Sequence, residues 1–128
     1  MTYYFTKTLA LPFDEAVTRT RDVLAKAGFG VISEIDIAKT LKAKIGAELR
    51  PYLILGACNP RMAYEAILLE DKVGTMLPCN VLVQELATGA VEVAAIDPAA
   101  SMQAIDNPKL REVAGQVGAL LKAAVAEL

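Results

Sequence analysis

Three dipeptides in which Asn or Asp precedes Pro divide the chain from residue 59 onward into segments. They are Asn59-Pro60, Asp97-Pro98 and Asn107-Pro108. An Asn or Asp side chain can accept a hydrogen bond from the first turn of a helix, and Pro is tolerated at the first helical position because it has no backbone N–H to satisfy there. Each dipeptide therefore predicts the start of a helix.

The apolar residues between these starts follow the periodicities of strands and helices. We expect five strands, near residues 3–9, 30–35, 51–58, 79–86 and 90–96. We expect helices near 12–27, 60–70 and 107–127, a short amphipathic helix after Asp36 that ends at Gly46, and one of one or two turns after Asp97. Since no repeat, linker or low-complexity segment interrupts this pattern, residues 1–128 are predicted to form one α+β domain.

The composition argues against several classes of function. The chain has 13 Lys and Arg against 15 Asp and Glu, and this balance lacks the positive charge with which nucleic-acid-binding proteins neutralise phosphates. It contains no His, which removes Ser-His-Asp and Cys-His catalysis and every His-ligated metal site. Gly-rich phosphate-binding loops are absent too. The sequence favours a non-enzymatic protein that does not bind nucleic acid, and it identifies no cofactor.

The same features predict where the protein works. Residues 1–7 lack the basic stretch and apolar run of a secretory signal. The last predicted helix carries scattered charges, among them Arg111, Lys122 and Glu127, which a membrane-spanning helix would not tolerate. With two cysteines and no signal, we expect a cytoplasmic protein with reduced thiols and no membrane partner.

Two Cys-Asn pairs form the candidate binding site. Cys58-Asn59 closes the third strand just before a helix, and Cys79-Asn80 opens the next strand. The positive end of a helix can lower the pKa of a thiol in the position of Cys58. If the two strands run antiparallel, both cysteines fall at the same end of the sheet, whereas in a parallel pair they fall at opposite ends. We expect a site in which Asn59 and Asn80 line the space around the two thiols.

Two interpretations of these residues remain open. On the functional one, Cys58 and Cys79 act as a pair. On the structural one, both are small buried side chains and Asn59 is only a helix cap. Two thiolates do not complete a tetrahedral metal site, although a symmetric dimer would offer four.

A resemblance to a known family comes from segments spread over most of the chain. The chain resembles the bacterial and archaeal family called domain of unknown function 302 in a series of central segments. They are the run Leu55-Gly-Ala-Cys-Asn-Pro60, then Ala63, Ala66-Ile67 and Leu77-Pro-Cys-Asn-Val81. The same family pattern is matched by an earlier stretch, which consists of Gly28-Phe-Gly-Val31, Glu34-Ile-Asp36 and the Lys-rich segment that follows. The resemblance therefore covers about residues 3–125. Many members keep the Asn-Pro and Leu-Pro segments without the cysteines, which makes the two thiols an addition to a structural frame.

The resemblance implies a two-layer α+β fold similar to that of the TATA-binding protein, with a β-α-β(4)-α plan and further inserted helices. Its antiparallel sheet of about five strands would be covered by helices, with the long helices on one face. It implies frequent dimers, no known catalytic residue and no transfer of DNA binding. An antiparallel sheet would also bring Cys58 and Cys79 to the same end.

These observations lead to two expectations of function from different classes. Because 55% of the residues are hydrophobic and a small domain buries proportionally little surface, we expect a homodimer with an interface of about 1,200 Å² or more. Its function would be to bind a small ligand or a partner protein on the sheet or in a dimer groove. The alternative is a thiol-based redox, sulfur-carrier, soft-metal or haem-binding protein that uses Cys58 and Cys79.

Overall fold

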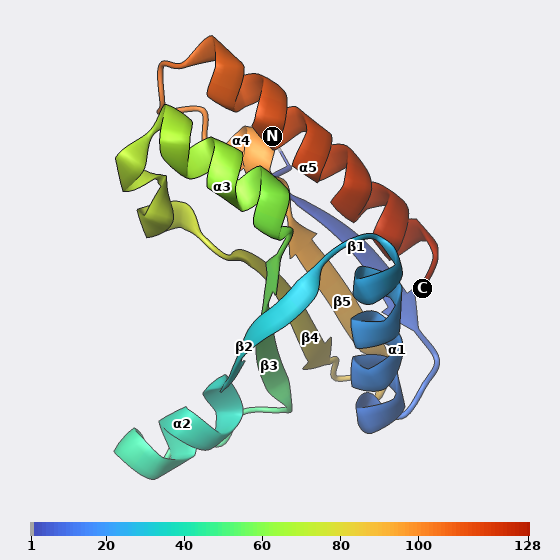
Figure 1. Cartoon of the computed structure of the whole chain (residues 1–128). Helices are drawn as coiled ribbons and strands as arrows, with labels where there is room; N and C mark the ends of the chain where they lie inside the picture. Colours follow the sequence, from blue (N-terminus) through green and yellow to red (C-terminus); the bar gives the residue numbers. More distant parts are fainter. Residues whose placement is uncertain (1) are drawn as a thin grey trace.

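The protein has a two-layer α+β fold in which helices cover one face of an antiparallel sheet (Figure 1). The structure is a computed structural model that describes residues 2–128. The strands are β1 (Tyr4–Leu9), β2 (Gly30–Asp36), β3 (Tyr52–Cys58), β4 (Cys79–Glu85) and β5 (Val91–Ile96). The α-helices are α1 (Phe13–Lys26), α2 (Ile37–Ile45), α3 (Pro60–Leu69), α4 (Pro98–Ser101) and α5 (Pro108–Ala126), and a 3₁₀ helix, η1 (Asp71–Met76), precedes β4.

The sheet has the strand order β1-β5-β4-β3-β2, and every neighbouring pair is antiparallel. This confirms the predicted five-stranded antiparallel sheet, and each strand lies within one or two residues of its expected position. The segment 71–76, for which no helix was predicted, forms η1. In β2, the register with β3 shifts between Val31 and Ser33, which leaves Ile32 without a paired partner. This irregularity lies beside the end of β3 that carries Cys58.

One face of the sheet forms the main core with α1 and α5. Alternate residues of β4 and β5, such as Val83 and Val93, are completely buried, as expected when every second side chain points to the covered face. They pack in one cluster with Leu24 of α1 and Leu121 of α5. Burying each of these side chains stabilises the fold by about 1.5–3 kcal/mol. The expectation that the two long helices cover one face is confirmed.

A second, smaller cluster lies between α3, η1, α4 and α5, beyond the end of the sheet. Val73 of η1, Met102 and Leu110 are almost fully buried there with Ala66 and Ala114. The cap Asn107 also joins these elements, because its Nδ2 donates to the Leu69 carbonyl at 3.0 Å. α3 is therefore held above the end of the sheet rather than over its middle (Figure 1).

Among residues 2–128, no helix covers the opposite face of the sheet (Figure 1). The pairings place Thr6, Ala94, Leu82, Ile54 and Ile35 in one row that crosses all five strands on this face. We call the strand residues on this side the open face. A row above and a row below it complete this surface, with Tyr4, Ile96, Asn80, Gly56 and Ser33 in one and Thr8, Glu92, Gln84 and Tyr52 in the other.

Helix α2 extends away from the rest of the molecule at the β2 edge (Figure 1). Asp36 caps it by accepting a hydrogen bond from the Lys39 backbone N–H at 2.9 Å, and Gly46 ends it at φ 67°. None of its residues is buried, and Ile45 is 74% exposed. Within residues 2–128, none of the helices is long and apolar enough to cross a membrane.

Candidate functional site

Cys58 and Asn59 lie where β3 ends and α3 begins. Asn59 Oδ1 accepts a hydrogen bond from the Met62 backbone N–H at 3.2 Å, and Pro60 occupies the first helical position. The Asn59 Nδ2 atom lies so close to Gly28 that a Cβ added to this glycine would be 3.4 Å from it. Asn59 is therefore a helix cap wedged against the loop before β2, and this position fixes the direction in which the chain leaves Cys58.

Cys79 is the first residue of β4 and comes to the same end of the sheet as Cys58. In the antiparallel β3–β4 ladder the partner of Cys79 is Ala57, the residue directly before Cys58. The antiparallel pairing thus brings the two cysteines together, as expected from the family resemblance. Both are free thiols.

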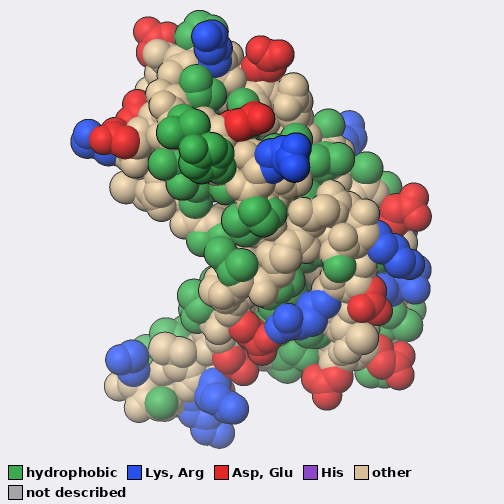
Figure 2. All heavy atoms as spheres, viewed as in Figure 1, with side chains coloured by type: hydrophobic (Ala, Val, Ile, Leu, Met, Phe, Trp, Pro, Cys, Tyr) green, Lys and Arg blue, Asp and Glu red, His purple; other side chains and the backbone are tan. Residues whose placement is uncertain are grey.

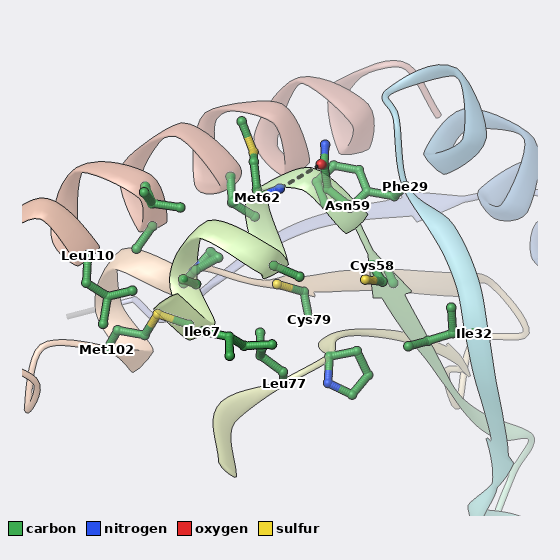
Figure 3. Close-up of a pocket in the computed structure, with 18 residues that line it drawn as sticks. Phe29, Ile32, Cys58, Asn59, Met62, Ile67, Leu77, Cys79, Met102 and Leu110 are labelled. Carbon is green, nitrogen blue, oxygen red and sulfur yellow. Dashed lines mark hydrogen bonds between the residues drawn. The ribbon is translucent and has the colours of Figure 1, made fainter. Parts of the chain in front are cut away.

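A mostly apolar cavity of about 290 Å³ lies between this end of the sheet and helices α3, α4 and α5 (Figure 3). The sheet side and the loops contribute Phe29, Ile32, Ala57, Cys58, Asn59, Leu77, Pro78 and Cys79 to its lining, and the helices and the turn after α4 contribute Met62, Ala63, Ala66, Ile67, Pro98, Met102, Leu110, Val113, Ala114 and Val117. Ile32 is 65% exposed and Ile67 46% exposed, so the cavity opens to solvent between β2 and α3. Apolar side chains gather over α3 and along the hollow below it (Figure 2).

The two thiols differ in their surroundings. Cys58 is partly exposed, whereas Cys79 is only 8% exposed. Burial raises the pKa of the Cys79 thiol to about 11, and the nearby Cys58 adds a smaller electrostatic contribution in the same direction. Cys79 is therefore a neutral thiol at pH 7.

Asn80 does not belong to this site. It is the second residue of β4, and successive side chains of a strand point to opposite faces. Asn80 is consequently exposed on the open face, beside Tyr4, Leu82 and Ile96 rather than beside Cys79. Of the two asparagines expected around the thiols, the structure therefore places Asn59 in the cavity lining and Asn80 on the open face.

Most of the cavity lining escaped the sequence analysis. Leu110, Ala114 and Val117 on α5, together with Met62 and Met102, were given no site role from the sequence. The helical spacing of the α5 residues predicts one buried face, but it does not predict that this face passes over Cys79. Within residues 2–128, no group of three or more Cys, His, Asp or Glu side chains is placed to hold a metal ion.

Comparisons with known proteins identify the family. The model of the family described as "Domain of unknown function DUF302" matches residues 5–128. The chain belongs to this family. A crystal structure of an uncharacterized conserved DUF302 protein from Bacillus stearothermophilus superposes on this DUF302 chain with a TM-score of 0.91, at 25% sequence identity and with 98% of each chain covered. No curated protein matches the sequence.

Proposed function

We propose that this DUF302 protein is a non-enzymatic binding protein whose cavity takes a small, uncharged, apolar ligand. The observation that carries the proposal is the lining, in which Asn59 is the one amide and every other side chain is a hydrocarbon, a thioether or a thiol. Ligand sites are typically apolar concavities of about 300–1,000 Å³, and an apolar cavity of about 150 Å³ is large enough for benzene. At about 290 Å³ this cavity suits a molecule of one or two rings or a short chain.

The same lining argues against catalysis. In the part of the chain that the structure describes, no carboxylate, Lys, Arg or Tyr side chain lines the cavity, and the sequence has no His. A general acid or base must lie within hydrogen-bond distance of the reacting group. Besides the two thiols, the cavity therefore offers a ligand no group that transfers a proton.

Binding of an uncharged naphthylamine dye, followed by fluorescence, tests this proposal. In the Ala114→Leu variant a larger side chain fills part of the cavity, and we expect dye binding roughly tenfold weaker, about 1.4 kcal/mol. Ala119→Leu makes the same change at an exposed position of α5 outside the cavity lining, and it should bind like the wild type. Equal binding by both variants would overturn the proposal.

We also propose that the protein is a homodimer that associates through its open face. The central row of that face is apolar from β5 to β2, and Glu92 is the one charged side chain among the paired strand residues there. Glu92 is already engaged, because it accepts a hydrogen bond from Gln84 Nε2 at 2.9 Å. A second copy of the same surface is a suitable partner, since a twofold axis can bring the two apolar central rows together.

The area of this surface suits a small interface. Five strands spaced about 4.8 Å apart and six residues of about 3.3 Å each give roughly 500 Å² per copy, or about 1,000 Å² for the pair. This is below the expected interface of about 1,200 Å² and only reaches the threshold of about 1,000 Å² for a biological interface. The projecting helix α2, with its exposed Ile45, is available to extend the contact.

A second candidate function uses the thiols. The observation that favours it is that Cys58 and Cys79, which are separate in the sequence, line one cavity as free thiols. A reducing compartment such as the cytoplasm suits such a pair. Haem fits this candidate least, because a porphyrin is larger than the cavity.

Alkylation with iodoacetamide, read by mass spectrometry, tests the thiol candidate. The partly exposed Cys58 should be labelled below pH 8, and the buried Cys79 should stay unlabelled until the chain is denatured. If both thiols are labelled slowly and only above about pH 8.5, the cysteines are core residues and the thiol candidate fails.

A further inference from the structure

Sulfur-bearing residues are concentrated at the apolar cavity. The chain has four Met and two Cys, and four of these six residues line the cavity, namely Cys58, Met62, Cys79 and Met102. Met62 belongs to α3 and extends toward α5, Met102 follows α4, and Cys79 begins β4 (Figure 3). The sulfur atoms therefore come to the cavity from different elements. Leu would supply a similar volume at each methionine position without a sulfur atom.

The thiol of Cys79 is a buried polar group without a partner in the protein. Cys79 is only 8% exposed, and its thiol has no hydrogen-bond partner among residues 2–128. Figure 3 draws its Sγ directed away from Cys58 and toward α3, whose Ala66 and Ile67 also line the cavity. Because burial raises its pKa to about 11, the thiol keeps its proton at pH 7 and can donate it in a hydrogen bond. A ligand in the cavity would be the acceptor.

An aromatic ring suits these groups better than a saturated ring. The face of an aromatic ring carries partial negative charge and accepts a weak hydrogen bond from S–H, whereas a saturated ring offers no acceptor. The polarizable sulfur of a thioether is attracted to the edge of an aromatic ring. The ring of Phe29, which also lines the cavity, can meet the ligand face to face with an offset or edge to face. Each contact is weak, but all of them act on one ligand.

We propose that the cavity binds an uncharged aromatic molecule of two fused rings, in contact with the sulfur atoms of Met62, Cys79 and Met102. This inference rests on the apolar-ligand function proposed above and names its ligand class. A cavity of about 150 Å³ holds benzene, and the volume of about 290 Å³ here leaves room for a second ring. A charged ring would lose its hydration without compensation, because no charged side chain among residues 2–128 lines the cavity.

Calorimetric titration with two alcohols of the same carbon skeleton tests the inference. 2-Naphthol is aromatic and uncharged at pH 7, and decahydro-2-naphthol is its fully saturated counterpart. The wild-type chain should bind 2-naphthol about tenfold more tightly, a preference that several sulfur–aromatic contacts supply together. Burial of hydrocarbon alone does not supply it, because both molecules have the same number of carbon atoms.

Replacement of the thioethers separates the sulfur contacts from the shape of the cavity. Met62→Leu combined with Met102→Leu keeps apolar side chains of similar volume. Decahydro-2-naphthol should therefore bind this double variant as before, while the affinity for 2-naphthol should fall about fivefold. Met76→Leu is the matched control, because Met76 lies on η1 outside the lining and is 37% exposed. It should bind both alcohols like the wild type, and thermal unfolding verifies that the variants fold.

The possible outcomes separate this inference from the function on which it rests. If the wild type binds both alcohols with equal affinity, the aromatic inference is overturned and the apolar-ligand proposal stands. A preference for 2-naphthol that survives the double substitution also overturns the inference, since the thioethers would then contribute nothing. If neither alcohol binds and the naphthylamine dye does not bind either, both proposals fail.

Discussion

Gly56 lies so close to Pro78 that a Cβ at position 56 would be 2.6 Å from Pro78 Cγ. The side chain of Ser33, which pairs with Gly56 across the β2–β3 ladder, would also collide with this Cβ. The end of β3 thus reaches its neighbours only because position 56 has no side chain. Two residues later the same strand presents Cys58 to the cavity.

Gly56→Ala should therefore destabilise the protein. Inserting a methyl group into a packed region typically costs about 1–3 kcal/mol, and here the rigid ring of Pro78 would have to shift to admit it. Urea unfolding measures the loss. Gly115→Ala is the control, because a Cβ added there, in the middle of α5, would have nothing within 4 Å, and it should stabilise the helix by about 0.5–1 kcal/mol. Changes of the same sign in both variants would contradict this account of Gly56.

The two asparagines of the Cys-Asn pairs should respond differently to substitution. Asn59→Ala removes the hydrogen bond to the first turn of α3 and should lower the free energy of unfolding by about 1 kcal/mol. Asn80→Ala changes an exposed side chain on the open face and should stay within about 0.5 kcal/mol of the wild type. Thermal unfolding of the two variants in one buffer makes the comparison, and equal losses would refute the assignment of Asn59 as a cap.

The raised pKa of Cys79 predicts a loss of stability at alkaline pH. Its pKa is about 11 in the folded protein against an ordinary 9.0, so the thiol ionises more easily in the unfolded chain. Its contribution to stability is fully present below about pH 9 and is lost as the pH rises toward 11. Two pKa units correspond to a loss of roughly 3 kcal/mol. Urea unfolding between pH 8 and 11 should show a steeper decline for the wild type than for Cys79→Ala, and parallel curves would count against a buried neutral thiol.

The proposed dimer depends on the centre of the open face. Leu82→Lys places a charge in the apolar row between Ala94 and Ile54, where a second copy would present the same charge. Sedimentation at tens of micromolar should give the dimer mass for the wild type and the monomer mass for this variant. Leu68→Lys, at a 68% exposed position on α3, should remain dimeric. A monomeric wild type would overturn the proposal, and thermal unfolding verifies that both variants fold.

The sequence predicted most of the fold because its signals are local. Asp36, Asn59, Asp97 and Asn107 cap helices at the expected positions, and each accepts hydrogen bonds from the first turn of its helix. Alternating apolar residues located the paired strands. The helix η1 was missed because its six residues, with Gly74 in the middle, have neither a strand nor a helix period.

The candidate site could be predicted only in part, because it depends on contacts between distant elements. Antiparallel pairing brought Cys58 and Cys79 together, as the family resemblance implied. The two Cys-Asn pairs looked equivalent in sequence, but Asn59 follows the end of a strand and Asn80 lies inside one, where alternation turns it away. The position of Ile32 at the cavity mouth follows from the register shift in β2, which no local pattern indicates.

The strand order has a consequence for how a newly made chain folds. β1 is synthesised first, yet its ladder partner is β5, where Thr6 meets Ala94. Until β5 has left the ribosome, β1 has no strand to pair with and the final covering helix α5 does not yet exist. Strands β2 to β5 are neighbours in the sheet in chain order, so each can pair with the strand made before it once the segment between them has been made. Pairing β1 with β5 requires closing a long loop, and the conformational entropy lost in doing so makes this step slow. The strand β1 should therefore join the sheet late, and until then its unpaired backbone groups are exposed to other chains.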